Sequence, residues 1–129
     1  MMTELNLNNI SKMAENIAKI KSVYAVYLFG SYATGKQTPL SDIDICVFAD
    51  KKISEKEKTD IFCCCSNEVD ISYFHELPIL IRYRVFRDGK PLLIRDKKKL
   101  HNDKYYTVKS YLDFRWIIDK NIAKVFGTC

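Results

Sequence analysis

The sequence predicts an α/β or α+β domain in which helices flank a mixed β-sheet. Some segments have apolar residues at helical spacing, and the segments between them contain short runs of β-branched and aromatic residues. The chain has 129 residues, of which 47% are hydrophobic, so we expect a single compact domain over residues 1–129. Helices and strands that alternate along a chain in this way usually pack as layers.

Helices are expected in four longer segments. In the first, apolar residues recur at every third or fourth position. The second begins at Ser54, which has the spacing of a capping box with Glu57. The helices are therefore expected over residues 7–20, 54–65, 78–86 and 105–126, with a further short helix within 31–37.

Strands are expected where β-branched and aromatic residues cluster between these helices. The last of these runs begins with Pro91, and a proline is tolerated best in a strand at the edge of a sheet. The four expected strands cover residues 23–29, 42–48, 68–74 and 91–95.

Composition narrows the possible location and partners. No segment approaches the roughly 18 consecutive apolar residues of a membrane span, and the N-terminus does not resemble a signal peptide, so a cytoplasmic location is expected. Five cysteines without a CxxC pair indicate reduced thiols. The net charge of +5 arises mainly from residues 82–124. This surplus is equally consistent with a solvated basic face and with a surface for an acidic partner.

One loop has the residues of a phosphate-binding site. Gly30 ends the first expected strand, where a glycine permits a tight turn and close approach of a ligand to the backbone. Ser31 supplies a hydroxyl and a backbone N–H at the expected start of a helix, where phosphate oxygens bind well. Lys36 adds a positive charge in the same loop, and we include Ser41 among the nucleotide-binding candidates.

Three aspartates are the candidate metal ligands and catalytic groups. Asp42 and Asp44 are two residues apart on an expected strand, so both side chains should lie on one face. Two carboxylates so placed repel each other unless a cation joins them, and Mg²⁺ prefers oxygen ligands together with substrate phosphates. Two Mg²⁺ ions could clamp a phosphoryl displacement, with Asp70 of the next strand as the third carboxylate.

The pattern Gly30-Ser31-x₁₀-Asp42-x-Asp44 resembles the signature of the polymerase-β-like nucleotidyltransferase superfamily. The short chain is similar to its minimal nucleotidyltransferase branch, whose members are commonly partnered with HEPN-domain ribonucleases in toxin–antitoxin pairs. The resemblance covers residues 23–74 by motif. It implies that the chain binds ATP and two Mg²⁺ ions, and transfers AMP to a tyrosine hydroxyl of a HEPN toxin, which silences the toxin.

One departure from the family pattern keeps alternatives open. Thr34 stands where family members often carry Arg or Lys, and Lys36 is the alternative source of that charge. A first alternative is a non-catalytic antitoxin or nucleotide-binding module that neutralises its partner by contact. A second is a small-molecule adenylyltransferase of the aminoglycoside type. The third is an enzyme that adds nucleotides to RNA, although no recognisable RNA-binding module is present, so nucleic acid is possible but not favoured as a partner.

Overall fold

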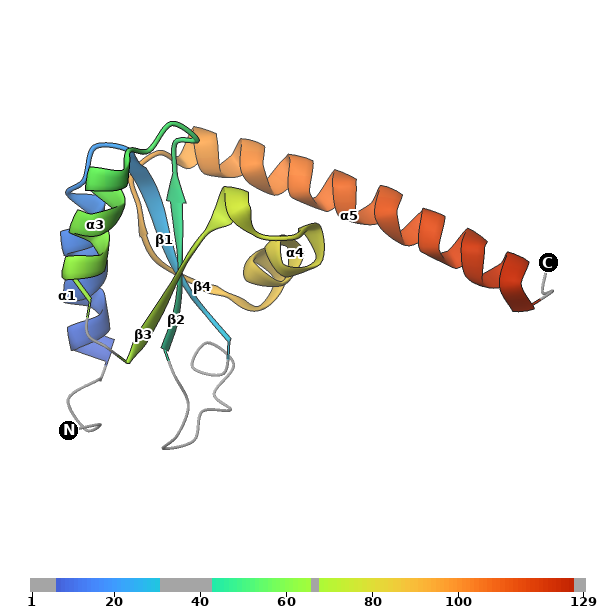
Figure 1. The fold of residues 1–129 in the computed structure, drawn as a ribbon, viewed down its shortest axis with the longest axis horizontal. Helices are drawn as coiled ribbons and strands as arrows, with labels where there is room; N and C mark the ends of the chain where they lie inside the picture. The colour runs from blue at the N-terminus through green and yellow to red at the C-terminus, as the bar shows by residue number, and fades with distance from the viewer. Residues whose placement is uncertain (1–6, 31–42, 66–67, 127–129) are drawn as a thin grey trace.

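The computed structural model describes residues 7–30, 43–65 and 68–126. Four helices, four strands and one short 3₁₀ helix alternate along these residues (Figure 1). In chain order they are α1 (Leu7–Ala18), β1 (Val23–Phe29), β2 (Ile43–Ala49), α3 (Glu55–Cys63), β3 (Val69–Tyr73), η2 (Phe74–Glu76), α4 (Ile79–Asp88), β4 (Lys90–Ile94) and α5 (Lys97–Phe126).

The four strands form one mixed sheet in the order β3-β2-β1-β4. β1 pairs antiparallel with both β2 and β4, whereas β2 and β3 run parallel. The end of β1 and the starts of β2 and β3 therefore lie at the same end of the sheet. Gly30, Asp44 and Asp70 lie at this end.

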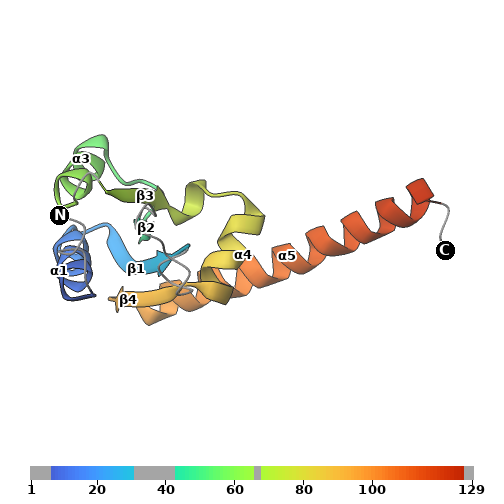
Figure 2. The same cartoon turned by 90° about the horizontal axis from the view of Figure 1, so that it is seen from below.

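Each face of the sheet is covered by helices, and each cover encloses its own apolar core (Figures 1 and 2). Alternating residues of β2 belong to opposite cores, as the two-residue period of a strand requires. Ile43, Ile45 and Val47 pack with α1 and α3, while Cys46 and Phe48 pack with η2, α4 and α5. The expected class of fold, a mixed sheet flanked by helices, is confirmed.

Local contacts explain where two of the helices begin. The Ser54 hydroxyl accepts from the backbone N–H of Glu57, whose carboxylate accepts from the backbone N–H of Ser54, so the expected capping box opens α3. At α5, the carboxylate of Asp96 accepts from the backbone N–H groups of Lys98 and Lys99.

The last helix is the main correction to the expected elements. We expected it from residue 105, but α5 begins at Lys97. Its first turns consist mostly of lysines and other polar residues, so they lack the apolar periodicity by which a helix is recognised in a sequence. Asp96 was the available signal, because an aspartate that precedes a helix caps its free N–H groups. The helix expected over 78–86 also extends further, to Asp88.

Two further expectations concern location and thiols. Among the described helices, none is both long and apolar enough to cross a membrane. The four described cysteines are free thiols, three of them in the run Cys63–Cys65. The short helix expected within 31–37 lies outside the described residues.

Candidate active site

Asp44 and Asp70 lie next to each other on the parallel strands β2 and β3. They are register partners, and neighbouring strands are about 4.8 Å apart. Side chains of register partners in a parallel pair project from the same face of the sheet. Asp44 alternates with Ile43 and Ile45 of the first core, so the two aspartates project from the face that carries α4 and α5. Asp44 is half-buried and Asp70 is exposed.

Gly30 lies on the other side of Asp44, at the end of β1, so that Asp70, Asp44 and Gly30 form a row across the sheet. It follows Phe29 of β1, which is the register partner of Asp44. Gly30 has a φ of 79°, in the left-handed region that favours glycine. A Cβ atom at this position would lie 2.3 Å from the Asp44 carboxylate oxygen Oδ2. The absence of a side chain at Gly30 therefore leaves room for the Asp44 carboxylate to approach the backbone closely.

Three of the seven predicted site residues can be placed. Gly30, Asp44 and Asp70 come together at one end of the sheet, although they are up to 40 residues apart in the chain. The other four, Ser31, Lys36, Ser41 and Asp42, lie outside the described residues. Within the described part of the chain, no group of three or more His, Cys, Asp or Glu side chains could hold a metal ion.

The described carboxylates nevertheless fit the chemistry expected of a magnesium site. Asp44 and Asp70 supply hard oxygen ligands side by side, on a strand pair whose remaining side chains at this level are apolar. Mg²⁺ is usually bound by one or two carboxylates plus water and substrate phosphates. The hollow beside Gly30, which has a volume of about 230 Å³, would provide space for such phosphates.

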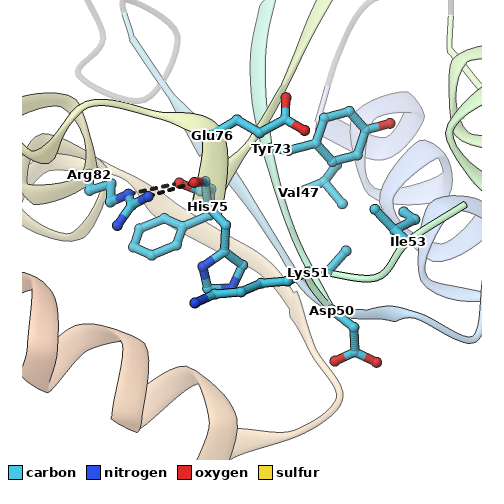
Figure 3. Close-up of a pocket in the computed structure, with 10 residues that line it drawn as sticks. Val47, Asp50, Lys51, Ile53, Tyr73, His75, Glu76 and Arg82 are labelled. Carbon is cyan, nitrogen blue, oxygen red and sulfur yellow. Dashed lines mark hydrogen bonds between the residues drawn. The ribbon is translucent and has the colours of Figure 1, made fainter. Parts of the chain in front are cut away.

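A second cavity lies at the opposite end of β2 and is separate from the aspartates (Figure 3). It has a volume of about 350 Å³ and reaches Ala49, five residues along the strand from Asp44 and thus about 16 Å away. Arg82 and Glu76, which line it, have partners already. Arg82 donates to the backbone carbonyls of Phe74 and His75. Glu76 accepts from Lys58 at 2.8 Å.

His75 has a structural role that the sequence did not reveal. His75 belongs to a partly buried cluster that joins β1, η2 and α5. The Tyr24 hydroxyl donates to the Asp103 carboxylate and lies 3.2 Å from His75 Nε2. Burial, reinforced by the hydrogen bond to Asp103, raises the pKa of Tyr24 far above its usual value, so the hydroxyl keeps its proton. These three residues are distant in sequence and share no motif.

Comparison with known protein families agrees with this geometry. The model of the polymerase β nucleotidyltransferase family matches residues 8–98. This chain belongs to that family. The match includes Gly30, Asp44 and Asp70, and extends beyond the motif region to β4 and the start of α5. The resemblance expected from the sequence is therefore confirmed.

Two relatives are protein adenylyltransferases. A putative protein adenylyltransferase of Methanocaldococcus jannaschii is 29% identical over 102 residues, which cover 79% of this chain and 80% of the relative. The protein adenylyltransferase MntA of Shewanella oneidensis is 31% identical over 96 residues, covering 70% of this chain and 67% of the relative.

Solved structures of toxin–antitoxin complexes contain chains of the same fold. A chain in the crystal structure of a toxin–antitoxin pair with AMP-PNP is 25% identical, with a TM-score of 0.71 over 95% of this chain and 99% of that one. The fold also matches a chain of the complex between tri-AMPylated Shewanella oneidensis HEPN toxin and MNT antitoxin. That chain is 23% identical with a TM-score of 0.66, over 98% of this chain and 99% of the other.

Proposed function

We propose that this protein is a Mg²⁺-dependent adenylyltransferase that transfers AMP from ATP to a tyrosine hydroxyl of a HEPN-family toxin and thereby acts as its antitoxin in the cytoplasm. The observation that carries the proposal is the row Gly30, Asp44 and Asp70 at one end of the sheet. Membership of the nucleotidyltransferase family and the similarity to protein adenylyltransferases support it.

The proposed reaction is a displacement at the α-phosphorus of ATP. The tyrosine oxygen forms a bond to the α-phosphorus, the bond from that phosphorus to the oxygen bridging to the β-phosphate breaks, and pyrophosphate leaves. Asp70 lies on the exposed edge strand, where an acceptor from another protein can reach it, and accepts the hydroxyl proton. Catalysis then consists mainly of positioning and electrostatic stabilisation.

Each site residue has a role in this proposal. Gly30 and Ser31 contact the triphosphate through the backbone and the serine hydroxyl, and Lys36 and Ser41 add a positive charge and a further hydroxyl. Asp42, Asp44 and Asp70 hold the metal. Two Mg²⁺ ions bound there would neutralise phosphate charge and lower the pKa of the attacking hydroxyl.

Helix α5 provides the surface on which we place the toxin. Its first half is anchored to the domain: Leu100 and Thr107 are buried, and the rings of Tyr83 and Tyr111 stack at 3.7 Å. The C-terminal half of the helix projects past the sheet (Figures 1 and 2). Five apolar side chains on this projecting part are about half exposed or more: Leu112, Trp116, Ile117, Ile122 and Val125. Exposed apolar patches of this kind usually mark contacts with another protein.

The charge of α5 indicates the character of that partner. The helix carries eight lysines and arginines against three aspartates. A second copy of the same helix would bring like charges together, whereas a partner with acidic residues around an apolar groove would complement it. We therefore favour a hetero-oligomer with the toxin over a homodimer through α5.

The test of the proposed activity is transfer of label from ATP labelled at the α-phosphate. The purified protein is incubated with its partner toxin and Mg²⁺, and the toxin is checked for label. Asp44→Asn and Asp70→Asn should each lower the transfer rate by about 100-fold or more, because each removes charge at the reacting centre. Asp60→Asn is the matched control and should transfer normally, because α3 packs on the opposite face of the sheet from Asp44 and Asp70. Normal transfer by both site variants would contradict the proposal.

A contact-only antitoxin remains the second candidate, and the Thr34 departure favours it. The two candidates differ in what an Asp42→Asn/Asp44→Asn double variant does to the toxin. If neutralisation depends on AMP transfer, cells that express the toxin with this variant stop growing. Continued growth at wild-type levels would favour neutralisation by contact.

A further inference from the structure

Helix α4 carries three arginines, and two of them have partners within the domain. Arg82 donates from Nε and Nη2 to the backbone carbonyls of Phe74 and His75. Arg87 forms a two-pronged pair with the Asp88 carboxylate, at 3.0 and 2.8 Å. The side chain of Arg84 is exposed and makes no ion pair or hydrogen bond with any other described residue.

Arg84 reaches the candidate active site. It lines the hollow of about 230 Å³ together with Gly30, Phe29, Ile81 and Asp88. Both carboxylate oxygens of Asp88 are bonded to Arg87, so part of the negative charge in this hollow is already balanced. Arg84 thus brings a full positive charge to the glycine that contacts Asp44.

The order of the groups across the sheet indicates which phosphates of a bound nucleotide would face Arg84. Asp70 lies on the edge strand β3, Asp44 on β2, and Gly30 at the end of β1, with Arg84 in the hollow beside Gly30. All three charged side chains lie on the face covered by α4. A nucleotide whose α-phosphate is next to Asp70 and Asp44 would therefore extend its β- and γ-phosphates toward Arg84.

We propose that Arg84 binds the β- and γ-phosphates of ATP through its guanidinium. This inference rests on the proposed function, because it assumes that the hollow beside Gly30 receives a nucleotide. A guanidinium presents several N–H donors in a planar fork that matches phosphate oxygens, and it stays charged at physiological pH. It would hold the two phosphates that leave as pyrophosphate when the bond to the α-phosphorus breaks.

The experiment measures nucleotide binding by isothermal titration calorimetry, on the full chain without its toxin. The ligands are a non-hydrolysable ATP analogue and AMP, each with Mg²⁺. Arg84→Gln should weaken binding of the ATP analogue by about tenfold or more, since a charge-assisted hydrogen bond is lost. Binding of AMP, which has neither a β- nor a γ-phosphate, should be unchanged. Arg84→Lys should fall between wild type and Arg84→Gln for the ATP analogue.

Arg115→Gln is the matched control, because it removes one exposed guanidinium from the projecting part of α5. It should bind both ligands as the wild type does. If Arg84→Gln keeps wild-type affinity for the ATP analogue, or loses affinity equally for the analogue and for AMP, the assignment of Arg84 is wrong, while the proposed activity stands. If the wild type itself binds neither ligand, the proposed function fails and the inference fails with it.

Discussion

Gly30 and Asp44 form the contact on which the geometry of the candidate site depends. The spacing of Gly30, Asp42 and Asp44 in the sequence indicated their chemistry, because glycine and paired carboxylates have few other reasons to recur in that pattern. The sequence could not show that Asp70 is the register partner of Asp44, since strand pairing is not a local property. Nor could it identify Arg84, which no motif includes and only the packing of α4 brings to Gly30.

Substitution of Gly30 by alanine should damage the site and the fold together. The new Cβ would lie 2.3 Å from Asp44 Oδ2, and the φ of 79° is strained for any residue with a side chain. We expect a loss of about 1–3 kcal/mol in the free energy of unfolding, measured by urea denaturation, and a large loss of AMP transfer. Gly89→Ala has no positive φ but would also meet a backbone oxygen at 2.3 Å, so it should destabilise the protein while leaving Asp44 in place. Equal stability of Gly30→Ala and wild type would contradict this account of Gly30.

At the scale of elements, local signals predicted most of the structure. The expected strand over 23–29 agrees with β1, and the capping box of Ser54 and Glu57 opens α3 as expected. The beginning of α5 was missed because a capping aspartate precedes lysines rather than an apolar stripe. What fixes that helix to the domain is tertiary: Asp103 of α5 meets Tyr24 of β1 and His75 of η2.

This cluster should make stability depend on pH. Burial lowers the pKa of His75 from its ordinary value of 6.5, against the opposing effect of the Asp103 carboxylate and with support from Lys51 and Arg82. Below pH 6.5 His75 of the unfolded chain binds a proton, whereas His75 of the folded chain binds one only at lower pH. The contribution of His75 to the free energy of unfolding is therefore fully present above pH 6.5 and decreases as the pH falls. We expect the midpoint of thermal unfolding to fall between about pH 7 and pH 5, and to fall less steeply in His75→Gln.

His101→Gln is the control for that measurement, because His101 is exposed on α5, two residues before Asp103. It should keep the pH dependence of the wild type. The account of the cluster is wrong if His75→Gln and wild type lose stability in parallel over this pH range.

At the scale of the whole molecule, α5 is longer than the part of the domain on which it packs. A helix of 30 residues measures about 45 Å, and its last turns extend past the sheet with apolar side chains exposed (Figure 1). Because α5 is anchored through Asp103 and Tyr111, a partner bound to the projecting part would be held in a fixed relation to the active site.

Leu112 and Trp116 are one turn apart on the projecting part of α5 and test this surface. Replacement of both by serine should weaken binding to the toxin by about 30-fold or more, because exposed aromatic anchors often dominate an interface. Binding of ATP should be unchanged, since neither residue is near the sheet end. Phe62→Ser is the matched control: Phe62 is 69% exposed on α3, and its loss should not affect the toxin. Wild-type affinity of the α5 variant, measured by surface plasmon resonance, would place the toxin elsewhere.

The most direct test of the central claim is the intact mass of the toxin after it has been incubated with this protein, ATP and Mg²⁺. The proposed function predicts that the toxin gains the mass of one or more AMP groups on tyrosine and loses its ribonuclease activity, and that neither change occurs with Asp44→Asn. A toxin that is inhibited with its mass unchanged would contradict the claim and identify the protein as an antitoxin that acts by contact.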